Sequence, residues 1–164
     1  MKNTLSFSNA AKAAAACAIC AVACLLVGWL SSLFQGESLS QWYPLIKKPS
    51  FTPPSMVFPI AWCILYVLSG ISAGLVLTSP KEGKTAPILI FCAQLFANFL
   101  WSVLFFGMHN PAAGLADSIV LLILAALYAK CAWNISKTAS IIFVPYALWC
   151  AFATILNLWI VFLN

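Results

Sequence analysis

Five long apolar runs constrain the fold of this chain more than any other feature. Their approximate limits are residues 13–34, 54–79, 86–107, 112–134 and 139–163. Each run matches the roughly 20 residues that a helix needs to cross a bilayer core. Charged residues make up only 7% of the chain, whereas a soluble domain carries about a quarter. The sequence therefore predicts an all-α membrane protein, a bundle of five transmembrane helices that forms one domain over residues 1–164 within the lipid bilayer.

The segment between the first two runs, residues 35–53, differs in character from the rest of the chain. From residue 42 to residue 54 the sequence reads WYPLIKKPSFTPP, which combines aromatic residues, two lysines and several prolines. Proline fixes the backbone φ angle and so restricts a loop. We expect a structured loop here. We also expect the second helix to open on Pro53 and Pro54, since proline is tolerated in the first helical turn.

The lysines predict an orientation in the membrane. With five spans, six lysines fall on the N-terminal side, whereas Lys47 and Lys48 fall on the other side. The positive-inside rule then places the N-terminus in the cytoplasm of a bacterial cell. Lys2 and Lys12 also precede an alanine-rich run, as in a signal peptide, but the apolar run continues to Phe34 and favours a retained span.

Several classes of function find no support in the residues. The formal net charge is +5, but the lysines are scattered between apolar runs, so we expect no nucleic-acid partner. The seven cysteines lie within or at the ends of these runs, where cysteine behaves as a small hydrophobic residue. His109 lies in a turn and is expected to be solvated. No metal-ligand set and no conventional catalytic constellation is apparent, so we expect no metal site and no required cofactor.

Two features within the runs have structural interpretations. Gly70 and Gly74 form a G-x-x-x-G pattern, which lets helices approach closely either within the bundle or between two copies. Asp117 lies close to the turn between the third and fourth runs, where we expect it to cap or brace the fourth helix.

Polar residues deep inside a span usually face the interior of the bundle and mark function. Gln94, Asn98 and Trp101 share one face of the third helix by their spacing. Along the helix, Asn98 lies roughly 14 Å and Gln94 roughly 20 Å from the end nearer the 35–53 loop. These residues could instead hold neighbouring helices together through hydrogen bonds.

Aromatic residues on two other helices could complete a pocket. Trp62 and Tyr66 lie one turn apart on the second helix, and Trp149 and Ala153 lie one turn apart on the fifth. Both tryptophans are too deep for an interfacial belt, although they could simply fill the core. If these faces converge, they form an aromatic pocket for a flat, mostly apolar ligand, open toward the loop.

The motifs WYPLIKKPSFTPP, VFPIAWCILY, QLFANFLWSVLFFG, AD at 116–117 and PYALWCAFATILN occur in this order. Together they resemble the translocator protein family, also called the peripheral-type benzodiazepine receptor and, in bacteria, TspO. The resemblance covers about residues 25–164. It implies a five-helix membrane protein, often a homodimer, that binds porphyrins such as protoporphyrin IX and, in some members, sterols and synthetic isoquinoline or benzodiazepine ligands.

The resemblance also implies site residues. Trp62 and Trp149 match two pocket tryptophans that the family links to light-dependent porphyrin breakdown, so they are the candidate catalytic residues. The ligand-binding candidates are Trp42, Phe58, Trp62, Tyr66, Gln94, Asn98, Trp101, Trp149 and Ala153. The lid candidates are Lys47, Lys48, Pro49 and Phe51, of which the lysines could meet porphyrin carboxylates.

Three positions depart from the family pattern. Phe51 stands where the family usually has a second loop tryptophan, so stacking in the lid would depend more on Trp42. About position 113 animal members have a pocket tryptophan, whereas this chain has Ala113. The C-terminal LNLWIVFLN lacks the tyrosine and the basic residue of the cholesterol-recognition pattern.

These observations favour a membrane protein that binds tetrapyrroles and acts in porphyrin sensing, transport or homeostasis. The first alternative is an enzyme that degrades porphyrin with light and oxygen through its pocket tryptophans. The second is a lipid- or sterol-binding or structural scaffold.

Overall fold

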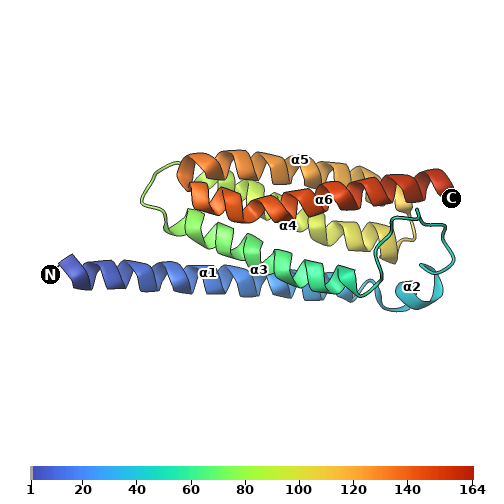
Figure 1. Cartoon of the computed structure of the whole chain (residues 1–164), viewed down its shortest axis with the longest axis horizontal. Coiled ribbons are helices and arrows are strands. Elements are labelled where there is room, and N and C mark those ends of the chain that lie inside the picture. Colours follow the sequence, from blue (N-terminus) through green and yellow to red (C-terminus); the bar gives the residue numbers. More distant parts are fainter. Residues whose placement is uncertain (1) are drawn as a thin grey trace.

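The protein is a bundle of long helices with the two ends of the chain at opposite ends of the bundle (Figure 1). The computed structural model describes the backbone of residues 2–164 and the side chains of residues 9–164. The elements in order are α1 (Lys2–Ser32), α2 (Gly36–Gln41), α3 (Val57–Thr78), α4 (Thr85–Ser102), the π-helical turn η1 (Val103–Gly107), α5 (Pro111–Ile135) and α6 (Lys137–Leu163).

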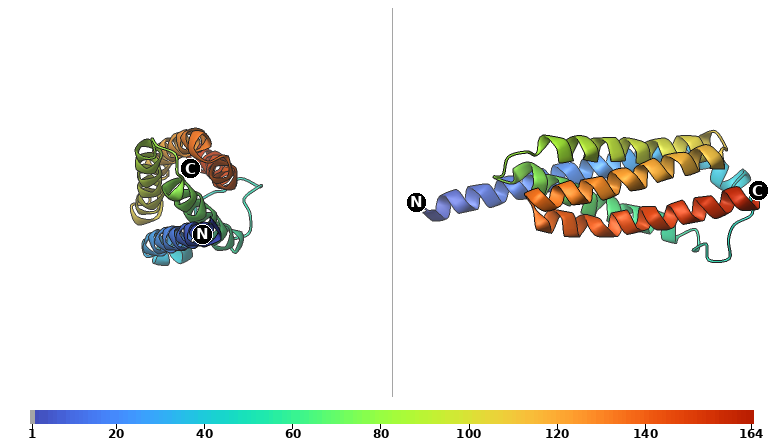
Figure 2. Two further views of the ribbon diagram at one scale, coloured as in Figure 1. Left: turned by 90° about the vertical axis from the view of Figure 1, so that its left-hand side faces the viewer. Right: turned by 90° about the horizontal axis from the view of Figure 1, so that it is seen from above.

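Five of these segments are long and apolar enough to cross a membrane, which confirms the predicted all-α bundle of five spans. Viewed along the bundle in Figure 2, α3 lies between α1 and the group formed by α4, α5 and α6. The 35–53 loop, which contains α2, lies at the end opposite the N-terminus (Figure 1). At the N-terminal end, Lys81 and Lys84 lie between α3 and α4 and Lys137 begins α6, whereas the side chain of Lys2 is outside the described side chains. The cytoplasmic location of this end stays a prediction.

One predicted helix start and one predicted helix cap were wrong. The second spanning helix begins at Val57, three residues after Pro54. A residue that precedes proline is biased toward extended backbone, which delays the helix until the proline pair has passed. The fourth spanning helix is capped by Asn110, whose side chain accepts a hydrogen bond from Ala113 N at 3.0 Å, and not by Asp117. Asp117 lies nearly two turns inside the helix, too far along to meet the free N–H groups of the first turn.

The end of the third span is a π-helical turn where the sequence predicted a regular helix. Met108 N donates to Val103 O at 2.8 Å, and the turn presents Phe105 and Phe106 as buried side chains. Such π-turns inside helices often mark functional sites. Here the turn directs both rings toward the loop, where they form an anchor for it.

The G-x-x-x-G pattern packs within the chain. A Cβ on Gly70 would collide with the backbone of Ala21, and one on Gly74 would lie 2.5 Å from the Cα of Cys17. The backbones of α1 and α3 therefore touch directly, as small residues allow in membranes. This confirms the reading in which these glycines pack inside the bundle, and a homodimer would have to use another surface.

A buried hydrogen-bond network joins three helices in the N-terminal half of the bundle. Ser72 Oγ donates to Ala139 O at 2.8 Å, and lies 2.9 Å from the hydroxyl of Tyr128. All three residues are fully buried. The network fixes α3, α5 and α6 relative to one another.

We expect Ser72→Ala to lower the free energy of unfolding by about 1–3 kcal/mol, because it leaves the Tyr128 hydroxyl and the Ala139 carbonyl buried without this partner. Tyr128→Phe should have a smaller effect, since Ser72 keeps its bond to Ala139. Thermal unfolding of both variants in detergent measures the difference. Equal effects would contradict the shared role of Ser72.

Candidate functional site

An aromatic cluster lies between α3 and α6, and we call it the α3–α6 cluster: Phe58, Trp62, Tyr66, Tyr146 and Trp149. Its centre is the contact between Trp62 and Trp149, whose rings pack edge to face with centroids 6.5 Å apart. Trp62 also packs on Tyr66 at 5.6 Å and on Tyr146 at 6.1 Å, while Phe58 packs on Trp149 at 6.0 Å. The structure thus brings together the aromatic residues that the sequence placed on two separate helix faces.

Helix α4 supplies the amide groups beside this cluster. The hydroxyl of Tyr66 donates to Oδ1 of Asn98, and both side chains are buried. Behind Tyr66, Gly28 of α1 leaves room for the ring, since a Cβ there would collide with it. Gln94 lies one turn from Asn98 on the same face and is completely buried. Two helices and a glycine of a third therefore hold Tyr66 in place.

Several buried polar atoms have no hydrogen-bond partner. Among the side chains of residues 9–164, the buried orphan atoms are Nε2 and Oε1 of Gln94, the Tyr146 hydroxyl, Nε1 of Trp149 and Oδ2 of Asp117. A buried polar atom without a partner costs about 1–3 kcal/mol. Most buried polar groups in proteins are satisfied, so each exception needs an explanation. The Trp149 N–H, the Tyr146 hydroxyl and the Gln94 amide are thus available to a partner at or beside the α3–α6 cluster.

Trp42 and Trp101 belong to a second cluster, at the loop end of the bundle. Trp42 stacks on the ring of His109 with centroids 4.6 Å apart and packs edge-on against Phe105. Trp101 stacks on Phe105 at 4.7 Å, and its Nε1 donates to Oδ1 of Asn157 at 3.0 Å. We call this group the loop cluster. The structure therefore does not bring Trp42 and Trp101 into contact with the α3–α6 cluster.

His109 takes part in fixing the loop although its side chain is exposed, as the sequence predicted. Its Nε2 lies 2.8 Å from Ser38 Oγ, and its backbone has a φ of 50°, which is uncommon for a residue other than glycine. Ser38 Oγ also reaches the Phe106 carbonyl at 2.8 Å, and Gln35 donates to Ser102 Oγ at 3.0 Å. The loop is thus attached to η1 and to the end of α4.

The predicted lid residues differ in their surroundings. Lys47 has an exposed side chain, and its backbone N–H and carbonyl bond the Asn164 side chain at 2.9 and 3.0 Å. The ammonium group of Lys48 donates to the Tyr43 and Ile46 carbonyls of its own loop and lies 4.5 Å from the Tyr43 ring centroid. Lys48 therefore stabilises the fold of the loop with two of its three N–H donors, and Lys47 is the lysine whose side chain is more available to a ligand.

The two remaining lid residues also differ in their exposure to solvent. Pro49 is buried and its carbonyl accepts from both the backbone and the side chain of Thr52, whereas Phe51 is exposed. The loop therefore has a fixed turn at Pro49 and an exposed ring at Phe51.

Sequence reasoning missed Tyr146 as a site residue. It is fully buried, its ring packs on Trp62, and its hydroxyl is an orphan atom. Its spacing of three residues from Trp149 could have revealed it, since such residues share a helix face. Ala153, one turn after Trp149, is half-buried on the same helix.

Among the described side chains, few groups could form a disulfide or a metal site. All seven cysteines are free thiols. Within residues 9–164 no group of three histidine, cysteine or acidic side chains could hold a metal ion.

Comparisons with known proteins all point to the same protein family. The model of the TspO/MBR family matches residues 20–163 of the chain. The chain is 38% identical over 149 residues to the "Tryptophan-rich protein TspO" of Chlorobaculum tepidum, covering 90% of this chain and 94% of that protein. It is 41% identical over 143 residues to the Archaeoglobus fulgidus protein of the same name, covering 87% and 93%. To the human "Translocator protein" it is 32% identical over 130 residues, covering 77% and 76%.

Proposed function

The chain belongs to the TspO/MBR family, and from that premise we propose that it binds a tetrapyrrole such as protoporphyrin IX at the α3–α6 cluster, in porphyrin sensing, transport or homeostasis. A tetrapyrrole is flat, mostly apolar and bears carboxylates at one edge. Aromatic walls suit its faces, and amide groups suit its nitrogen atoms.

The orphan polar atoms are the observation that supports this proposal most directly. Gln94, Tyr146 and Trp149 place unpartnered donors and an acceptor at or beside the aromatic cluster. A ligand that separates Trp62 from Trp149 would replace their edge-to-face contact with stacking and would offer partners to these atoms. Binding then relieves a free-energy cost that the ligand-free protein bears.

Lys47 is suited to orient such a ligand. Its side chain is exposed in the 35–53 loop, at the end of the bundle where the carboxylate edge of a porphyrin would emerge. A contact of this kind at an exposed rim contributes only about 0–1 kcal/mol. The aromatic cluster, and not this lysine, should dominate the affinity.

Titration of the purified protein in nanodiscs with protoporphyrin IX in the dark tests the proposal. We expect saturable quenching of tryptophan fluorescence, and we expect Trp149→Leu to weaken binding about tenfold, which corresponds to about 1.4 kcal/mol. The matched control is Trp159→Leu, because Trp159 lies on the same helix but is 47% exposed. Equal affinity of the two variants, or quenching that never saturates, would refute the site and favour a scaffold without a small ligand.

A light-driven reaction at the same site is a second candidate function. Trp62 and Trp149 touch edge to face with ring centroids 6.5 Å apart, so a ligand that separates them would contact both rings. Light-excited porphyrin would be oxidised and dioxygen reduced, with the tryptophans passing electrons between them. Illumination in air should then convert the porphyrin Soret band into that of a product, and Trp62→Phe should abolish the conversion. A bound spectrum that is stable under light would exclude this reaction.

A further inference from the structure

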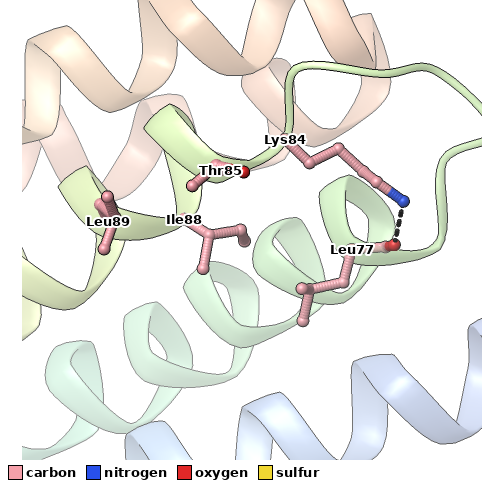
Figure 3. A pocket seen from close by; sticks show the side chains of 5 residues that line it. All are labelled: Leu77, Lys84, Thr85, Ile88 and Leu89. Carbon is pink, nitrogen blue, oxygen red and sulfur yellow. Dashed lines mark hydrogen bonds between the residues drawn. The ribbon is translucent and has the colours of Figure 1, made fainter.

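An apolar groove runs along the outer side of α4 at the N-terminal end of the bundle. Its first part, a hollow of about 290 Å³, lies between α3 and α4, with Lys84 and Thr85 at one end and Leu77, Ile88 and Leu89 along it (Figure 3). Its second part, of about 200 Å³, also includes Leu77 and Ile88. The two parts therefore form one groove.

The second part continues between α1, α3 and α4 toward the middle of the membrane. Its lining includes Cys20, Ala23, Cys92 and Leu95 and has no charged side chain. From Lys84 to Leu95 the groove extends roughly 16 Å along α4, about half of the roughly 30 Å hydrocarbon core. The groove therefore has the depth of one leaflet and the apolar lining that an acyl chain requires.

Positive charge is concentrated at the outer end of the groove. The ammonium group of Lys84 donates to the carbonyls of Leu77 and Ser79 at 2.9 and 3.0 Å, as Figure 3 shows for Leu77. The ammonium group of Lys81 donates to the Asn134 carbonyl at 2.8 Å. These carbonyls are neutral, and an ammonium group has three N–H donors, so Lys84 keeps its charge and one donor for a further partner.

Another lysine adds to this charge. Lys81, three residues before Lys84, belongs to the same connection between α3 and α4, although its ammonium group bonds the end of α5 and does not line the groove. Glu82 is the one acidic residue in the connection between α3 and α4. Two lysines against one glutamate leave the connection at the outer end of the groove positive.

We propose that this groove binds an anionic phospholipid, with one acyl chain between α1, α3 and α4 and with its phosphate on Lys84. The inference is independent of the porphyrin site, which lies on the inner side of α4. Charge disfavours a second copy of the chain as the occupant. A two-fold interface here would bring the same lysines of both copies together.

The headgroup contact is tested by titrating the detergent-purified, porphyrin-free protein with dioleoyl phosphatidylglycerol and counting bound lipid by native mass spectrometry. Dioleoyl phosphatidylcholine, which has the same chains and no net charge, is the comparison lipid. We expect tight binding of phosphatidylglycerol only. Lys84→Gln should weaken it about fivefold, whereas Lys47→Gln, at the opposite end, should leave it unchanged. Equal binding of both lipids, or no effect of Lys84→Gln, would overturn the proposal.

The acyl-chain contact is tested by filling the groove. Cys92→Trp should remove tight binding of phosphatidylglycerol with all lysines intact, because the indole occupies the second part of the groove. Cys63→Trp is the matched control, since Cys63 is also exposed but does not line the groove. Unchanged lipid binding in Cys92→Trp would refute the acyl-chain site. So would a lipid-free dimer, measured by light scattering, that Cys92→Trp dissociates, because the groove would then hold a second copy.

Discussion

Gly70→Leu should prevent the chain from forming a stable bundle. A Cβ alone at this position would overlap the backbone of Ala21, and backbone cannot move aside as a flexible side chain can. Helix α1 would have to move away from α3, and the direct backbone contact of these two helices would be lost. We expect a loss of more than about 4 kcal/mol, which is exceptional for one substitution.

Yield of monodisperse protein after membrane extraction, together with thermal unfolding, measures this effect. Gly36→Leu is the matched control, because a Cβ at Gly36 would meet nothing within 4 Å. A Gly70→Leu protein with an unchanged unfolding temperature would show that α1 and α3 do not touch as described.

Gln94→Leu should stabilise the ligand-free protein and weaken its binding of porphyrin. Both polar atoms of the Gln94 amide are buried without partners, so the ligand-free protein bears the cost of their desolvation. Leucine fills a similar volume without polar atoms, and we expect a gain of about 1–3 kcal/mol. The same change removes the groups offered to a ligand, so the affinity for protoporphyrin IX should fall about tenfold or more.

Asn98→Leu, one turn further along the same helix, should have the opposite effect on stability. Asn98 accepts a hydrogen bond from the buried Tyr66 hydroxyl, and its loss leaves that hydroxyl without a partner. We expect a loss of about 1–3 kcal/mol. Thermal unfolding of both variants without ligand measures these opposite effects on stability. Destabilisation by Gln94→Leu would mean that the amide is already satisfied in the free protein, and the strongest support for the pocket would be lost.

The number, type and approximate limits of the long helices followed from the sequence because lipid demands long uninterrupted apolar runs. The start of α3 at Val57 and the π-turn at Val103–Gly107 did not follow. Helix ends depend on local hydrogen bonds, and these are not visible in an apolar pattern. Likewise, the G-x-x-x-G spacing predicted a close contact but could not say whether α1 or a second copy would supply it.

The candidate site followed in part. Spacing within one helix placed Trp62 with Tyr66 and Gln94 with Asn98, because helical geometry fixes which residues share a face. The separation of Trp42 and Trp101 from the α3–α6 cluster depends on how the loop meets η1. The loop and η1 are joined by the ring of His109, which stacks on Trp42, and by Ser38. These contacts connect residues that lie far apart in the chain. Lys48 was expected to face a ligand, but its use by nearby carbonyls is likewise set by the loop's own turn.

The buried network of Ser72, Tyr128 and Ala139 has a mechanical consequence. It fastens α3, α5 and α6 in the N-terminal half of the bundle with satisfied hydrogen bonds. Toward the loop, α3 and α6 meet through the edges of Trp62 and Trp149, which form no hydrogen bond with each other. The two helices are therefore held together most firmly in the N-terminal half of the bundle. They should separate most easily toward the loop, where only the aromatic rings meet.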